Sequence, residues 1–230
     1  MTARVRLQLL ETAAVLDGSE PPSQWMTVHE LQCLQAMTAP ARRESFIAGH
    51  WQARQLAAQW LQLAPARIGL DIHPDGRPRL LVDAQPSSLH LSLSHGGGHL
   101  ALALSELPVG VDVEIPRKPR DLLALAGFSF SSEEVAQLRA CDAQARGALF
   151  HHYWALKEAR GKRSGEGLLP AQARRFSARP AIAASAEGCS WRVGEGALAL
   201  CVAAGTRIDV DAQLPEPPRF WQFVTEAASG

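Results

Sequence analysis

Two acidic side chains stand inside a short apolar run, GVDVEIP, at residues 110–116. Asp112 and Glu114 alternate there with valines and an isoleucine. Valine and isoleucine favour strands, in which residues two apart lie on the same face, about 6–7 Å from each other. We therefore expect a strand with both carboxylates on one face. Such a pair repels unless it is neutralised, and Mg²⁺, which proteins often hold with one or two carboxylates and substrate phosphates, is a candidate.

The acidic pair does not decide the matter alone. Asp209 and Asp211 in the segment IDVDA have the same spacing, and no chemistry-bearing residues surround them. A half-exposed strand with its polar face in water explains either pair equally well.

A second group of reactive side chains falls in FHHYWALKEARGK, residues 150–162. At about 100° per residue, Lys157 lies inside an apolar arc, Glu158 lies at its edge, and Lys162 follows one turn later. A solvated Glu158–Lys162 pair and a snorkelling Lys157 are the plainer alternatives. Gly161 costs roughly 1 kcal/mol relative to alanine inside a helix, so we expect the helix to loosen there and displace Lys162.

A third segment, SLSHGGGH at residues 92–99, has three glycines that could turn backbone N–H groups toward an anion, with His95 as a further donor. It is not a P-loop, because no Gly-Lys-Ser/Thr follows. A glycine-rich hairpin is the alternative.

The elements that must position these residues follow from the pattern around them. Thr27 and Glu30 form a capping-box signal for a helix through about Met37, and Pro40 begins a long helix. Alternation predicts strands at 4–11 and 89–94 and a β-hairpin over 98–115. Helices are expected from Ser132 and over 146–162, with strands and loops after them. We expect an α+β fold of two similar lobes, residues 1–108 and 109–230.

Composition limits the kinds of partner. The 230 residues include 23 basic and 23 acidic side chains, so no net charge favours nucleic acid or a membrane surface. The N-terminus shows no signal peptide, and the longest apolar run, 196–205, is too short to span a membrane. Four cysteines without a C-x-x-C pair indicate free thiols in a reducing cytosol, which predicts a cytoplasmic protein.

Six segments taken in order are more specific than any one of them: RRESFIAGH (42–50), GRPRL (76–80), LSLSH (91–95), GVDVE (110–114), FSSEE (130–134) and YWALKEARGK (153–162). This order resembles the surfactin-type (Sfp-like) 4′-phosphopantetheinyl transferases. Members carry a Gly-[Ile/Val]-Asp-[Ile/Val]-Glu strand followed by a Trp-x-x-Lys-Glu-x-x-x-Lys helix. Residues 110–114 match the first motif, and residues 154–162 match the second.

The resemblance implies a fold and an activity. The fold would be a pseudodimer of two α/β lobes with the active site in the cleft between them, in a chain that works as a monomer. The activity would be the Mg²⁺-dependent transfer of phosphopantetheine from coenzyme A to a serine of an apo acyl or peptidyl carrier protein, releasing adenosine 3′,5′-bisphosphate. A non-catalytic relative that binds coenzyme A or a carrier, and an unrelated Mg²⁺-dependent phosphohydrolase, are the alternatives. Fatty acid, polyketide and nonribosomal peptide carriers all remain open.

The resemblance also assigns roles to residues. Asp112, Glu114 and Glu158 would hold Mg²⁺, and Glu158 would also take the serine proton, which makes Asp112, Glu158 and Lys162 the catalytic group. Coenzyme A would contact the following residues: Arg42 or Arg43, Arg77 in place of the family's lysine, Ser94, His95, Lys157 and Lys162.

Two further assignments stay open between a site and a plain structural role. Glu134 matches a family glutamate and also completes a capping box with Ser131. The segment 117–130 combines Arg117, Lys118 and Arg120 with Leu122, Leu123, Leu125 and Phe128, which could dock an acidic carrier. Alternatively, these leucines enter the core.

Overall fold

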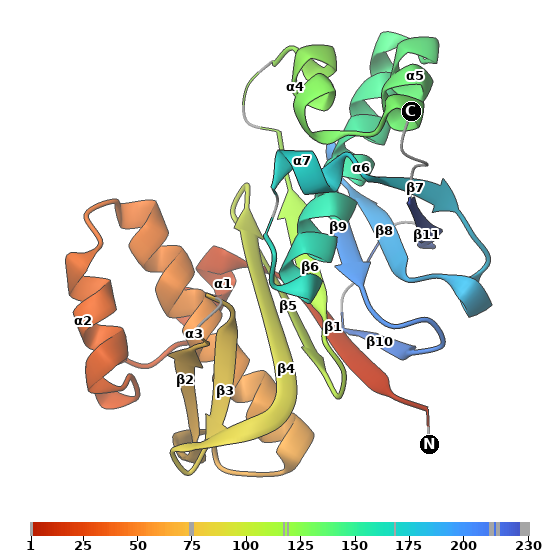
Figure 1. Ribbon diagram of the computed structural model, residues 1–230. Coiled ribbons are helices and arrows are strands. Elements are labelled where there is room, and N and C mark those ends of the chain that lie inside the picture. The colour runs from red at the N-terminus through yellow and green to blue at the C-terminus, as the bar shows by residue number, and fades with distance from the viewer. Residues whose placement is uncertain are drawn as a thin grey trace.

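The computed structural model describes residues 2–73, 76–116, 118, 120–167, 169–211, 214 and 217–225. Its centre consists of two β-sheets (Figure 1). Within the described residues the first sheet has the strand order β10-β1-β5-β4-β3-β2 and the second the order β6-β9-β8-β11-β7. Strands of the first sheet are β1 (Arg4–Glu11), β2 (Ile68–Ile72), β3 (Pro78–Val82), β4 (Gln85–Gly96), β5 (His99–Ser105) and β10 (Arg207–Asp211). Strands of the second are β6 (Gly110–Glu114), β7 (Phe176–Pro180), β8 (Gly188–Val193), β9 (Gly196–Cys201) and β11 (Arg219–Thr225).

Helices cover the outer faces of the sheets. Around the first sheet lie α1 (Thr12–Asp17), α2 (Val28–Ala36) and α3 (Pro40–Leu61). Around the second lie α4 (Leu122–Ser129), α5 (Ser132–Ala140), α6 (Ala143–Ser164) and α7 (Pro170–Ala173). Short 3₁₀ turns occupy Pro22–Gln24, Pro65–Arg67 and Ala183–Ser185.

The alternation of side chains along the strands creates three apolar layers. On β5, Leu100, Leu102 and Leu104 pack with α3, whereas Ala101 and Ala103 face the second sheet. Strand β9 repeats this pattern, since its leucines face the first sheet and its alanines pack under α6. The two sheets therefore stack face to face, with α3 on one outer face and α6 on the other. Each of these helices has 22 residues, and the α+β architecture predicted from the sequence is confirmed.

Most of the expected elements are present. Strand β1, the helix capped by Thr27 and Glu30, and the long helix from Pro40 are confirmed. Helix α6 extends through Gly161 and ends only at Gly165, whose φ is 80°. The expected loosening at Gly161 was wrong, because this residue is buried inside a helix that continues for another turn.

The predicted β-hairpin over residues 98–115 was also wrong. Strand β5 pairs with β1 and β4, whereas β6 pairs with β9 of the other sheet. Val111 and Val113 pack face to face against Ala101 and Ala103 rather than edge to edge, and the chain changes sheets between β5 and β6. Hydrophobic alternation cannot distinguish these two arrangements. Helices α1 and α4 were not predicted.

The position of the lobe boundary stays a prediction. Strand β10, at residues 207–211, lies parallel to β1 and so belongs to the first sheet although it comes late in the chain. In the described residues, no helix combines the length and the apolar character that crossing a membrane requires.

Candidate functional site

Strand β6 places its acids and its valines on opposite faces. Val111 and Val113 are fully buried between the two sheets, and Asp112 faces α6 instead. Only 7 % of Asp112 is exposed, so the surrounding protein screens its charge poorly. The polar face of β6 is thus covered by a helix rather than by water.

Gly110 lets α6 come unusually close to β6. A Cβ atom on Gly110 would lie 1.8 Å from the carbonyl oxygen of Ala159 and 2.6 Å from the backbone nitrogen of Arg163. Only a residue without a side chain fits between these two backbones. The glycine that opens the GVDVE motif therefore determines how closely the side chains of α6 approach Asp112.

The close approach of α6 to β6 brings Lys162 into contact with Asp112. Its Nζ lies 2.8 Å from Oδ1 of Asp112 and donates to the carbonyl oxygen of Val111 at 3.1 Å. Its side chain is 29 % exposed. Lys162 therefore forms its ion pair with Asp112, across the contact between α6 and β6. The solvated Glu158–Lys162 pair considered from the sequence is not what the structure shows.

Glu158 lies within electrostatic range of Asp112 and Glu114, and we call these three side chains the carboxylate cluster. Burial raises its pKa, and the negative charges of Asp112 and Glu114 raise it further, while Lys162 lowers it. The same local repulsion that shifts this pKa would favour a bound cation. Among the described residues, no group of three or more His, Cys, Asp or Glu side chains is arranged to hold a metal ion. The metal-ligand assignment of Asp112, Glu114 and Glu158 thus stays a prediction.

Strand β4 reaches the site from the first sheet with two serines. The hydroxyl of Ser92 accepts from the backbone N–H of Val111 at 3.0 Å, and that of Ser94 accepts from Val113 at 3.3 Å. Ser94 also donates to Oδ1 of Asp112 at 2.7 Å. These hydroxyls satisfy the outer edge of β6, where a further strand would otherwise pair. Sequence reasoning did not single out Ser92, although it shares the polar face of β4 with Ser94.

The glycine segment forms the turn between β4 and β5. Gly97 and Gly98 have φ values of 59° and 83°, which suits a tight hairpin turn. A Cβ on Gly96 would come within 2.5 Å of the carbonyl oxygen of Val113, so the hairpin is pressed against β6. The hairpin alternative is confirmed. His95 is exposed beside this turn, next to Ser94.

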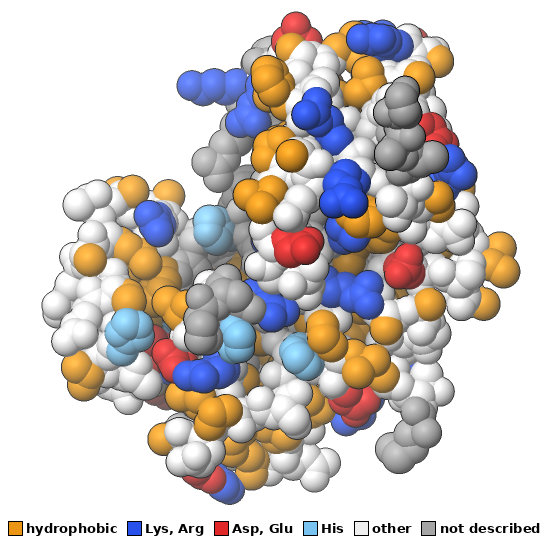
Figure 2. Space-filling model, viewed as in Figure 1, with side chains coloured by type: hydrophobic (Ala, Val, Ile, Leu, Met, Phe, Trp, Pro, Cys, Tyr) orange, Lys and Arg blue, Asp and Glu red, His pale blue; other side chains and the backbone are white. Residues whose placement is uncertain are grey.

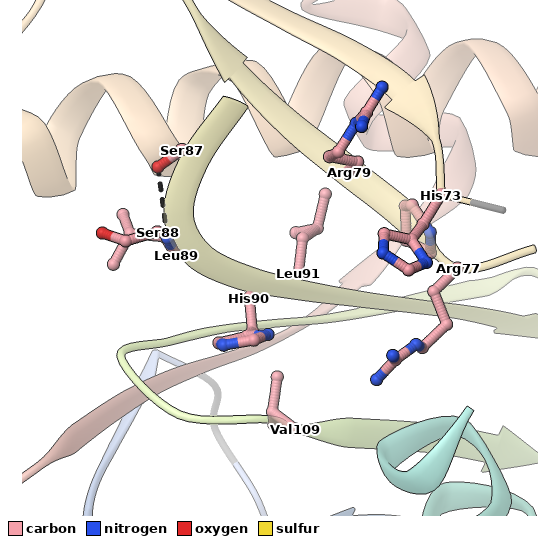
Figure 3. A pocket seen from close by; sticks show the side chains of 10 residues that line it. His73, Arg77, Arg79, Ser87, Ser88, Leu89, His90, Leu91 and Val109 are labelled. Carbon is pink, nitrogen blue, oxygen red and sulfur yellow. Dashed lines mark hydrogen bonds between the residues drawn. The ribbon is translucent and has the colours of Figure 1, made fainter. Parts of the chain in front are cut away.

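Arg77 lines a cavity of about 300 Å³ that is bordered by β3, β4 and Val109 (Figure 3). Its Nη1 donates to the carbonyl oxygen of Arg163, in the last turn of α6, at 3.1 Å. Burial lowers the pKa of His90 in the same cavity, and the charge of Arg77 lowers it further. The cavity also contains His73 and Arg79. Figure 2 shows Lys, Arg and His side chains gathered across the middle of this face.

The two arginines at the start of α3 differ in their surroundings. Arg43 donates to the carbonyl oxygens of Leu34 and Met37, where α2 ends. Cations stabilise this end of a helix, so Arg43 has a structural role there. Arg42 is exposed.

Lys157 is not brought to the carboxylate cluster. Its Nζ lies 2.9 Å from Oε2 of Glu134 and donates to the carbonyl oxygens of Ala173 and Phe176, at 2.7 and 2.6 Å. The two charged side chains are 3 % and 0 % exposed. Glu134 also completes the capping box with Ser131 and accepts from the N–H of Ala178. The structural alternative for Glu134 is therefore confirmed, and its buried partner could not be read from the sequence.

One segment of the chain, in its middle and C-terminal parts, matches a known family. Residues 108–203, which include β6, α6 and β9, match the model of the 4′-phosphopantetheinyl transferase superfamily. The matched segment makes up less than half of the chain. A 4′-phosphopantetheinyl transferase of Bacillus pumilus is 34% identical over 122 residues, which are 53% of this chain and 50% of the relative. Sfp of Bacillus subtilis strain 168 is 32% identical over 124 residues, 53% of this chain and 52% of Sfp.

A third relative gives a similar result. The transferase HetI of Nostoc sp. is 30% identical over 130 residues, which are 56% of this chain and 55% of HetI. The chain thus spans about half the length of the curated relatives it matches. The resemblance to Sfp-like phosphopantetheinyl transferases expected from the sequence motifs is confirmed.

Proposed function

We propose that this protein transfers 4′-phosphopantetheine from coenzyme A to a serine hydroxyl of an apo acyl or peptidyl carrier protein, in a Mg²⁺-dependent reaction that releases adenosine 3′,5′-bisphosphate. The proposal rests on the contact between β6 and α6. There Lys162 forms an ion pair with Asp112, and Asp112 and Glu114 raise the pKa of Glu158. These residues lie within the segment that matches the transferase superfamily.

The donor chemistry of the three carboxylates suits a hard divalent cation. Asp112, Glu114 and Glu158 supply only oxygen donors, the type that Mg²⁺ prefers. The raised pKa of Glu158 supports the fit, because it reflects burial and the neighbouring negative charges of Asp112 and Glu114. A cation held there would neutralise charge on the diphosphate of coenzyme A.

Residues of the chain itself would handle the proton and the phosphate charge. The serine oxygen attacks the phosphorus that bears the pantetheine arm, and the bond from this phosphorus to the oxygen of the adenosine bisphosphate breaks. Glu158 accepts the serine proton, directly or through a water molecule, and a raised pKa makes a carboxylate a better base. Lys162, already held by Asp112 and the carbonyl of Val111, presents positive charge to the phosphate oxygens.

Coenzyme A would extend from this cluster along the first sheet. His95 is exposed beside Ser94, and Arg77 projects from the first sheet toward the end of α6. We assign the phosphate contact at the start of α3 to Arg42, because the guanidinium of Arg43 already binds the end of α2. Lys157 is engaged with Glu134, and we assign it to stability rather than to coenzyme A.

The carrier would dock on the segment between β6 and α5. Lys118, Arg120 and Phe128 are exposed there, and 69 % of Phe128 is accessible. Leu122, Leu123 and Leu125 instead pack partly against the core, as the alternative reading of this segment expected. Arg117 lies outside the described residues. An acidic carrier would be steered by the basic side chains and held by Phe128.

The docking proposal has its own test. Reversing Arg117 and Lys118 to glutamate should raise the KM for the carrier and flatten its salt dependence, while the KM for coenzyme A stays almost unchanged. Arg67→Glu, which reverses an exposed charge in the 3₁₀ turn before β2, is the control. Unchanged carrier kinetics in the folded double variant would place the docking site elsewhere.

We also propose a cytoplasmic monomer. Cys33, Cys141, Cys189 and Cys201 are free thiols, which suits a reducing compartment. Both sheets are contributed by the same chain, which supports function without a second copy.

Incubation with coenzyme A, Mg²⁺ and an apo carrier tests the proposed activity. Mass spectrometry should show phosphopantetheine on the carrier serine, with release of adenosine 3′,5′-bisphosphate. Binding of coenzyme A without carrier modification would instead identify a non-catalytic relative. Bisphosphate release without any carrier would indicate a phosphohydrolase.

A further inference from the structure

The hydroxyl of Ser94 is already engaged in two hydrogen bonds. Its Oγ donates to Oδ1 of Asp112 at 2.7 Å and accepts from the N–H of Val113 at 3.3 Å. A serine hydroxyl has one proton to donate, and here that proton is directed to Asp112. Ser94 is only 7 % exposed, so little of it is open to a ligand. This arrangement does not suit a donor to a phosphate of coenzyme A.

The contacts of Asp112 are concentrated on one oxygen. Both the Ser94 hydroxyl and the Lys162 ammonium bind Oδ1, at 2.7 and 2.8 Å. In the part of the chain that the structure describes, the side-chain hydrogen bonds of Asp112 all end on this atom. Two donors on Oδ1 fix the plane of the carboxylate and leave Oδ2 as the oxygen for a cation. Mutation of a group that holds a metal ligand in this way commonly lowers metal affinity by about 10–100-fold.

We infer that Ser94 is a positioning residue for Asp112 and not a contact for coenzyme A. Strand β4 places the Ser94 hydroxyl against both the backbone N–H of Val113 and the side chain of Asp112. The position of the first sheet therefore determines the orientation of the Asp112 carboxylate, which faces α6. The inference rests on the proposed function, since it deepens the role of Asp112 as a cation ligand.

Ser92 offers a matched control on the same strand. It lies two residues before Ser94 and is buried to a similar degree, at 4 % exposure. Its hydroxyl accepts from the N–H of Val111, as Ser94 accepts from that of Val113. Replacing either serine by alanine removes one acceptor from the edge of β6. Only the change at Ser94 also removes a hydrogen bond to Asp112.

Binding measurements on the full chain separate the two roles of Ser94. Mn²⁺ binding is followed by electron paramagnetic resonance without coenzyme A, and coenzyme A binding is followed by calorimetry without a divalent cation. Ser94→Ala should weaken Mn²⁺ binding about tenfold or more and leave coenzyme A binding unchanged within about twofold. Ser92→Ala should change neither affinity. Ser94→Thr, which keeps a hydroxyl, should restore Mn²⁺ binding, and thermal unfolding verifies that each variant is folded.

Several results would overturn the inference. Weaker coenzyme A binding by Ser94→Ala with unchanged Mn²⁺ affinity would make Ser94 a phosphate contact. Equal losses of Mn²⁺ affinity in the two alanine variants would reduce its role to support of the strand. Carrier modification by the unaltered protein is measured separately. Its failure would reject the proposed function, while the Mn²⁺ comparison would still decide whether Ser94 orients Asp112.

Discussion

Replacing Gly110 by alanine should displace the site residues, because the added side chain collides with the backbone of α6. The added Cβ would lie 1.8 Å from the carbonyl oxygen of Ala159, whereas ordinary van der Waals contact begins at about 3.4 Å. Relief requires a relative movement of β6 and α6 of about 1.6 Å, and both colliding groups are backbone atoms that cannot rotate away. Lys162 and Asp112, now 2.8 Å apart across this contact, would lose their hydrogen-bond geometry. Overpacking of this kind commonly costs about 1–3 kcal/mol of stability.

The effect on transfer should exceed the effect on folding. A misplacement of about 1 Å can reduce catalysis about 100-fold, so Gly110→Ala should lower the rate of carrier modification by at least that factor. Chemical denaturation measures the loss of stability, and mass spectrometry of the carrier measures the rate. Gly147→Ala is the control, because a Cβ at that position of α6 meets nothing within 4 Å. A Gly110→Ala protein with normal stability and normal transfer would refute the close approach of α6.

Three further predictions concern charged and ionisable residues. Lys157→Ala should cost about 3–5 kcal/mol in chemical denaturation, because it leaves Glu134 charged and buried without its partner, and a variant of unchanged stability would refute the buried pair. The raised pKa of Glu158 means that the folded state keeps a proton which the unfolded state loses above about pH 4.5, so the free energy of unfolding should fall as pH rises through that raised pKa. Glu158→Gln should lack this component in denaturation measured across the same pH range, and an identical pH dependence would contradict the shift. His95→Ala should weaken coenzyme A about tenfold more than dephospho-coenzyme A in calorimetry if His95 contacts the 3′-phosphate, whereas equal losses would place it elsewhere.

The sequence predicted the local elements of this fold better than their pairing. Capping residues such as Thr27 and Glu30 act within one helical turn, so their pattern is visible in the chain itself. The partner of β6 is β9, which lies more than eighty residues later. No local signal distinguishes this pairing from a hairpin with β5, because both arrangements bury the same valines.

For the candidate site as well, the sequence predicted local features better than the contacts between distant segments. Asp209 and Asp211 share the spacing of the β6 acids, yet they bind exposed arginines at the surface, whereas Asp112 is covered by α6. Spacing alone therefore could not identify the chemical pair, and the second motif on α6 was needed. The engagement of Lys157 with Glu134 was beyond sequence reasoning, because it depends on how α5 and α6 pack.

Mass spectrometry of an apo carrier protein after incubation with coenzyme A and Mg²⁺ tests the central claim most directly, when the unaltered protein is compared with Asp112→Ala. We predict that the unaltered protein adds phosphopantetheine to the carrier serine, and that the folded Asp112→Ala variant leaves the carrier unmodified. A carrier left unmodified by the unaltered protein would contradict the proposed transferase activity. Near-normal modification by Asp112→Ala would contradict the assignment of the carboxylate cluster as the cation site.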